Sequence, residues 1–131
     1  MKESVKELIK EELRVAEKRL KAAKILFKEN MLEDAVNRAY YAVFYAAKAM
    51  LNSLGYDAKT HSGLISEFGL RIIKEGLLPM KYGRILRRAF EMRESGDYEI
   101  GVFFDRNEVK GLIKNAEEFI KRAKKFVREQ L

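Results

Sequence analysis

The sequence contains no cysteine and no tryptophan, and only one proline, one histidine and one threonine among its 131 residues. Without cysteine, disulfide bonds, thiolate metal sites and cysteine nucleophiles are excluded, and a reducing cytoplasm is the expected compartment. A single histidine argues against a zinc site, and no phosphate-binding loop is present, so we expect no cofactor. No run of 18 or more apolar residues occurs, and the opening MKESVKELIKEEL is charged throughout. We therefore expect neither a signal peptide nor a membrane helix.

The charge balance is basic, with 27 Lys and Arg against 20 Asp and Glu and a formal net charge of +7. Such an excess favours encounters with polyanions such as RNA or nucleotides, or with an acidic protein partner. The alternative is structural. A chain with 36% charged residues also resembles the ion-paired surface of a thermophile protein, on which a positive excess carries no specific meaning.

The pattern of apolar residues predicts an all-α fold. Apolar positions recur at helical spacing, strand-like alternation is absent, and 47% hydrophobic content in 131 residues can close one core. We expect a single domain over residues 1–131, built as an up-and-down antiparallel bundle of about five helices with short connections. The predicted helices cover about residues 4–29 and 32–53, followed by a third from Thr60 to a stop at Gly76, a fourth that begins near Pro79, and a last one that opens at Asp105 and carries its stripe to Val127.

Several residues mark the predicted helix boundaries. Thr60 is a plausible N-cap for the third helix, and Pro79 stands where the fourth would begin. The stretch RESGDYEIGVFF, residues 93–104, breaks the helical pattern, and Asp105 with Glu108 resembles a capping box for the last helix.

Residues 37–48, NRAYYAVFYAAK, place an arginine and three tyrosines in an otherwise apolar helix. At 100° per residue the helix has two faces. The predicted core face carries Val36, Ala39, Tyr40, Val43, Ala47, Met50 and Leu54, and the opposite face carries Asp34, Arg38, Tyr41, Tyr45, Lys48 and Asn52. We expect Tyr40 to be buried with its hydroxyl bonded to one partner.

Arg38, Tyr41 and Tyr45 lie one turn apart on the second face, where a guanidinium can stack on the rings. Such a surface suits a base, a phosphate or a partner helix. The alternatives are a solvated face, a cover supplied by another helix of the bundle, or a dimer contact, since tyrosine and arginine are enriched at interfaces.

Arg93 continues the apolar stripe of the fourth helix and should therefore point inward. A buried guanidinium needs a partner, and the candidates are Asp97, four residues on, and the nearby tyrosine hydroxyls. The pair is either a structural clamp or holds Arg93 at the rim of a cleft for phosphate. His61, beside Thr60 at a helix start, is either a capping or hydrogen-bonding residue or a candidate general base.

Three motifs in order, EDAVNRAYYAVFYAAKAML, then KTHSG followed by Phe68, then RESGDYE, resemble the HEPN (higher eukaryotes and prokaryotes nucleotide-binding) domain family over about residues 10–125. The likeness is to its small stand-alone archaeal and bacterial members. This resemblance implies a helical bundle that dimerises. It also implies a partner, a minimal nucleotidyltransferase in a toxin–antitoxin-like pair, and many family members are metal-independent ribonucleases.

The nuclease motif of that family is an arginine followed four to six residues later by a histidine. Arg93 matches the arginine, but the positions after it hold Asp97, Tyr98 and Glu99 and no histidine. A carboxylate clamped to Arg93 would be a poor proton acceptor, and His61 could substitute only if the fold brings it to Arg93. In some family members the partner transferase modifies a tyrosine of the motif, and Tyr98 is the similar position.

Three hypotheses follow. In the first, the protein is a dimeric HEPN partner of a nucleotidyltransferase that binds RNA or nucleotide in a basic cleft near Arg38, Tyr41, Tyr45, His61, Arg93 and Tyr98. In the second, it is a ribonuclease toxin whose catalytic candidates are Arg93, Asp97 and His61. In the third, it is a non-catalytic helical adaptor. The site hypothesis depends on Arg38 and Arg93 sharing a sheltered hollow with the tyrosines.

Overall fold

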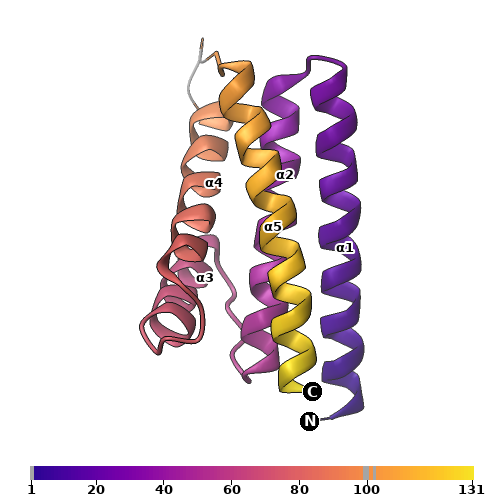
Figure 1. Cartoon of the computed structure of the whole chain (residues 1–131), viewed down its shortest axis with the longest axis vertical. Coiled ribbons are helices and arrows are strands. Elements are labelled where there is room, and N and C mark those ends of the chain that lie inside the picture. Colours follow the sequence, from indigo (N-terminus) through magenta and orange to yellow (C-terminus); the bar gives the residue numbers. More distant parts are fainter. Residues whose placement is uncertain (1, 99–100, 102) are drawn as a thin grey trace.

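The computed structural model describes residues 2–98, 101 and 103–131, and of Tyr98 only the backbone. Within this part the chain forms α1 (Glu3–Lys28), α2 (Leu32–Ser53), α3 (His61–Phe68), η1 (Gly69–Ile73), α4 (Met80–Tyr98) and α5 (Arg106–Gln130). All six are helical, and η1 is a π-helical turn that continues α3. The long helices α1, α2, α4 and α5 lie side by side, with the short α3 beside the lower end of α4 and both termini at one end of the bundle (Figure 1). The predicted all-α bundle is confirmed.

The second helix, α2, is the centre of the bundle, since it packs on α1, α5 and α4. Every residue of its predicted core face is buried except the half-buried Leu54. Four further alanines are buried around it, and their small side chains let the neighbouring helices approach closely: Ala35, Ala42, Ala46 and Ala49. The largest buried side chains include Tyr40, Phe68 and Phe119. Burial on several sides makes α2 a rigid base for any side chain that it presents.

The position predicted for Asn52 was wrong. Asn52 was expected on the exposed face of α2, but it is 6% exposed and donates from Nδ2 to both carboxylate oxygens of Glu12, at 2.9 and 3.0 Å. Because α1 packs against that side of α2, the last turn of α2 is covered where a free amphipathic helix would meet water.

The predicted start of the third helix is confirmed. Thr60 is extended at the N-cap, and its Oγ1 accepts a hydrogen bond from the Gly63 amide at 2.9 Å. Capping of this kind satisfies one of the free amides of the first turn. It also fixes His61, the first helical residue.

The predicted break at residue 93 was wrong, because α4 continues to Tyr98. Two features keep this stretch helical. Arg93 Nε lies 2.9 Å from Asp97 Oδ2, an i,i+4 ion pair along the helix. Gly96 offers no side chain, which leaves room for the ring of Phe104 beside it. Arg93 therefore lies within the last two turns of the helix.

The last helix begins as predicted at Asp105, whose Oδ1 accepts from the Asn107 amide at 3.4 Å. Glu108 does not complete the expected capping box. Its Oε2 instead lies 2.9 Å from Arg88 Nη2 and joins α5 to α4. Other pairs between helices include Lys24 with Glu117 and Lys124 with Glu17, so part of the surface charge is paired, as the ion-paired alternative predicted.

Among the described residues, no helix has the length and apolar character needed to cross a membrane.

Candidate functional site

Side chains from three helices meet in one aromatic cluster, which we call the His61 cluster: Tyr40, Tyr41 and Phe44 from α2, His61 from α3, and Phe90 and Arg93 from α4. The His61 ring lies 4.8 Å from Phe44, 5.7 Å from Tyr40 and 5.9 Å from Tyr41, measured between ring centroids. Phe90 contacts Tyr40 at 5.9 Å. The three sequence motifs are thus brought together in space.

Tyr40 is the buried centre of the cluster, with no exposed surface. Its hydroxyl oxygen lies 2.6 Å from His61 Nδ1, which is the single partner expected for a buried tyrosine. Burial raises the pKa of Tyr40 well above its ordinary value, so the hydroxyl keeps its proton at every physiological pH. The hydrogen bond joins α2 to the start of α3.

His61 is half-buried at the edge of the cluster. Burial and then the positive charge of Arg93 lower the pKa of His61. Both effects disfavour the imidazolium, so the ring is neutral at neutral pH. His61 and Arg93 both lie against the rings of Tyr40 and Tyr41, so the fold places them in the same cluster.

Arg93 is held on several sides. Its guanidinium carbon lies 5.5 Å from the Tyr40 ring centroid and 5.6 Å from that of Tyr41, a cation–π arrangement. Asp97 is paired with Nε, as predicted, and Glu94 Oε1 is 3.8 Å from Nη1. With 12% of the side chain exposed, Arg93 reaches solvent only at its edge. Its guanidinium therefore lies against the rings of both tyrosines.

Arg38 does not join this arrangement. It is exposed, and its Nη1 donates to Asn37 Oδ1 at 3.3 Å. The guanidinium that stacks against Tyr41 is that of Arg93 rather than the expected Arg38. The site hypothesis depended on two arginines beside the tyrosines, and the structure places only Arg93 there.

Tyr41 and Tyr45 are both half-buried, with ring centroids 6.3 Å apart. Tyr45 is connected to the cluster through Phe44, at 5.2 Å. The predicted surface of Tyr41 and Tyr45 is therefore present as a partly exposed aromatic edge. Tyr98, the position similar to a modified tyrosine in the family, has a side chain that lies outside the described part of the chain.

Sequence reasoning missed Phe44 and Glu12. Phe44 follows Tyr40 by one turn, so the i,i+4 spacing could have predicted that the two side chains are neighbours. Glu12 stands three residues after Ile9 and four before Ala16, within the apolar stripe of α1. That spacing signals burial of a carboxyl, but nothing in the sequence identifies Asn52 as its partner.

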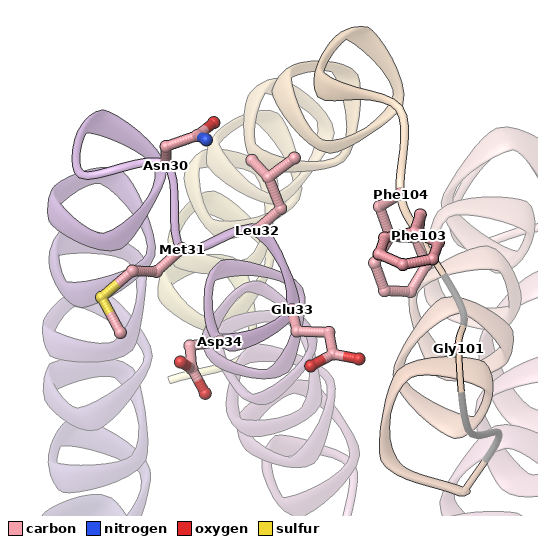
Figure 2. Close-up of a pocket in the computed structure, with 8 residues that line it drawn as sticks. All are labelled: Asn30, Met31, Leu32, Glu33, Asp34, Gly101, Phe103 and Phe104. Carbon is pink, nitrogen blue, oxygen red and sulfur yellow. The ribbon is translucent and has the colours of Figure 1, made fainter.

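The widest hollow described, about 580 Å³, lies elsewhere, between the α1–α2 corner and the segment before α5. Figure 2 shows Glu33 and Asp34 on one side of it and Phe103 and Phe104 on the other. Phe103 is 93% exposed. Neither this hollow nor four smaller ones in the described residues is lined by Arg93, His61 or Tyr41, so the predicted cleft at the cluster stays a prediction.

The His61 cluster offers flat rings, one guanidinium and one neutral imidazole. These groups can stack on a base and donate hydrogen bonds to an anionic oxygen. Among the described residues there is no group of three or more histidine or acidic side chains that could hold a metal ion.

Comparison with known proteins places the chain in a family. The HEPN domain family profile matches residues 9–126. A protein of Methanocaldococcus jannaschii named "Putative toxin" is 38% identical over 131 residues, which is 100% of this chain and 97% of the relative. A second protein of that organism with the same designation is 30% identical over 112 residues, 86% of this chain and 76% of the relative.

A Thermotoga maritima protein named "UPF0332 protein" is 37% identical over 107 residues, 82% of this chain and 81% of the relative. The family match covers most of the chain and all three motifs from which the resemblance was recognised. The chain belongs to the HEPN domain family.

Proposed function

We propose that this protein is the HEPN component of a toxin–antitoxin-like pair, acts as a dimeric partner of a minimal nucleotidyltransferase, and binds RNA or nucleotide at the His61 cluster. Membership of the HEPN family and two relatives named as toxins support the toxin-like class. The transferase partner rests on the family resemblance of the motifs and is a proposal for this chain.

The observation that carries the binding proposal is the meeting of Arg93, His61 and Tyr41. They come from three helices whose motifs are separated by some twenty to fifty residues in the sequence. Arg93 supplies a positive charge, His61 a neutral imidazole, and Tyr41 a partly exposed ring. A phosphate beside an unpaired base can contact these groups together, because bases stack on aromatic rings and phosphates accept from guanidinium groups.

A single-stranded RNA binding experiment tests this proposal. Fluorescence anisotropy of a 5′-labelled 12-nucleotide RNA should show binding at low salt that weakens as salt rises, because counterions are released on binding. Arg93→Gln should lower the affinity at least about tenfold, since a charge-assisted contact is lost. Arg128→Gln removes the same charge from the exposed last turn of α5 and is the matched control.

The outcomes separate the hypotheses. Equal loss in both variants would mean diffuse charge attraction rather than a site at the cluster. No RNA binding at low salt would leave the adaptor hypothesis. Thermal unfolding of each variant is measured alongside, because Arg93→Gln also removes the ion pair with Asp97.

A ribonuclease is the second candidate, favoured by one observation: His61 and Arg93 lie against the same two tyrosine rings. In the absence of the motif histidine, the nuclease hypothesis needs another histidine in the same cluster as Arg93. Cleavage of the labelled RNA in EDTA, abolished by His61→Ala, would support it. Intact RNA after prolonged incubation with the wild-type protein would exclude it for that substrate.

A further inference from the structure

In the hydrogen bond between Tyr40 and His61, either residue can be the donor, because each carries one proton that could lie between them. A tyrosine hydroxyl carries one proton, and a neutral imidazole carries one proton on either Nδ1 or Nε2. The hydroxyl oxygen and Nδ1 are 2.6 Å apart. Only one hydrogen fits between two atoms at this distance, so either Tyr40 donates to Nδ1 or Nδ1 donates to Tyr40.

Burial decides between the two directions. Tyr40 has no exposed surface, and in the described part of the chain His61 is the only hydrogen-bond partner of its hydroxyl. If Nδ1 donated, the hydroxyl proton of Tyr40 would point among the rings of Tyr41, Phe44 and Phe90 without a hydrogen-bond acceptor. If Tyr40 donates, its proton is satisfied, and the proton of the imidazole is on the other nitrogen of a residue that is only half-buried.

We propose that Tyr40 is a positioning residue that donates to His61 Nδ1 and thereby holds His61 in the tautomer with its proton on Nε2, so that His61 presents a neutral N–H donor to a phosphate oxygen. This inference rests on the proposed function, since it names the chemistry of the ligand at the same cluster.

The tautomer changes what His61 can do. A nitrogen that carries a proton has no free lone pair, so Nε2 cannot take a proton from a ribose hydroxyl. Protonation would have to occur at Nδ1, which Tyr40 occupies. The lowered pKa of His61 agrees with this, because the imidazolium would also face the charge of Arg93. His61 therefore binds an acceptor and does not serve as a general base.

The ligand class follows from the two donors. His61 Nε2–H requires an acceptor, and it lies in the same cluster as the guanidinium of Arg93, which is paired with Asp97 and Glu94. Beside a guanidinium, an anionic phosphate oxygen suits this N–H better than a neutral amide or hydroxyl group. The partly exposed rings of Tyr41 and Phe44 flank His61 at 5.9 and 4.8 Å. The cluster is thus suited to hold a phosphodiester or nucleotide phosphate without cleaving it.

The proton position can be measured directly, because His61 is the only histidine in the chain. In uniformly ¹⁵N-labelled wild-type protein, a two-bond ¹H–¹⁵N correlation spectrum should show a neutral ring with Nε2 protonated. In Tyr40→Phe, which keeps the ring and removes the hydroxyl, the spectrum should shift toward a mixture of tautomers. A wild-type ring protonated on Nδ1, or a spectrum unchanged in Tyr40→Phe, would overturn the inference.

Binding of the 12-nucleotide RNA gives the second readout. Tyr40→Phe should weaken binding about three- to tenfold, the effect of misplacing one neutral hydrogen bond. Tyr82→Phe removes the hydroxyl of another buried tyrosine, on α4, and should leave affinity unchanged. His61→Ala should lose affinity, and His61→Gln, whose amide nitrogen can replace Nε2–H, should recover most of it.

The two proposals fail differently. If wild-type protein binds no RNA at low salt, the proposed function fails at this cluster and the ligand part of the inference fails with it, and the spectrum still decides the proton position. If RNA binds but Tyr40→Phe binds as tightly as wild type, the positioning role fails and the proposed function stands. Cleavage of RNA that both His61→Ala and His61→Gln abolish would show that His61 is a base and overturn the inference.

Discussion

At the scale of single residues, Glu12 is the ionisable side chain whose environment differs most plainly from water, since it is only 5% exposed and lies in the core. Both of its oxygens accept from one amide group, Nδ2 of Asn52. Burial raises the pKa of Glu12, and the Asn52 hydrogen bond and the charge of Lys48 only partly oppose this. The folded protein therefore holds a proton on Glu12 at pH values where the unfolded chain has released it.

The sign of the pH dependence follows from this difference in bound protons. Below the ordinary pKa of 4.5 the contribution of Glu12 to stability is fully present. It is lost as pH rises through the raised pKa of the folded state. Glu12→Gln stays neutral, so we expect it to lack this part of the pH dependence. The unfolding free energy of Glu12→Gln should therefore increase relative to that of wild type as pH rises toward neutrality.

Urea unfolding of wild type and Glu12→Gln across about pH 4 to about pH 8 measures this. Glu7→Gln, an exposed position on the same helix, controls for removal of one carboxylate and should follow wild type. A difference between Glu12→Gln and wild type that stays constant over that range would contradict the prediction.

At the scale of the element, the helices were predictable because each carries an apolar stripe at helical spacing, and Thr60 and Asp105 mark two of the helix starts by their side-chain chemistry. The end of α4 was not predictable in the same way. Glycine and serine in RESGDY signal a break, but Gly96 is used to admit the Phe104 ring, a contact with a residue outside the helix. Tertiary contacts of this kind override local propensity and leave no periodic signal.

Gly96 offers a test of this explanation. Alanine in place of a helical glycine normally stabilises by roughly 0.5–1 kcal/mol. At Gly96 a Cβ would lie 3.1 Å from Phe104 Cε2, whereas at Gly111 on α5 it meets nothing within 4 Å. We expect Gly111→Ala to gain the full amount in urea unfolding and Gly96→Ala to gain less or to lose stability.

Combining Gly96→Ala with Phe104→Ala shows whether the ring is responsible. In the Phe104→Ala background the penalty should vanish, so that Gly96→Ala and Gly111→Ala have the same effect. Equal stabilisation by the two alanines in the wild-type background would mean that Phe104 moves aside freely and that its ring does not explain why glycine stands there.

At the scale of the whole molecule, the candidate site is a product of topology. Arg93 with Asp97, and Tyr40 with one hydroxyl partner, could be predicted because an inward-facing polar group needs a partner. That His61 is the partner of Tyr40 could not, since the two stand 21 positions apart and only the packing of α3 onto α2 joins them. The same limit explains the error over Arg38. Arg38 shares a helix face with Tyr41, but the arginine that contacts the Tyr41 ring is Arg93, which comes from another helix.

The proposed dimer makes the last prediction at this scale. Tyr41, Phe44 and Tyr45 are half-buried neighbours on α2, and clustered aromatic side chains of this kind are typical of protein interfaces. We expect light scattering to give twice the mass of the chain, and Tyr45→Lys to give a monomer because it places a charge in the aromatic edge. Leu8→Lys makes a comparable change at an apolar residue of α1 that is 46% exposed and should leave the dimer intact. A dimer that survives Tyr45→Lys and dissociates with Leu8→Lys would move the interface from α2 to α1.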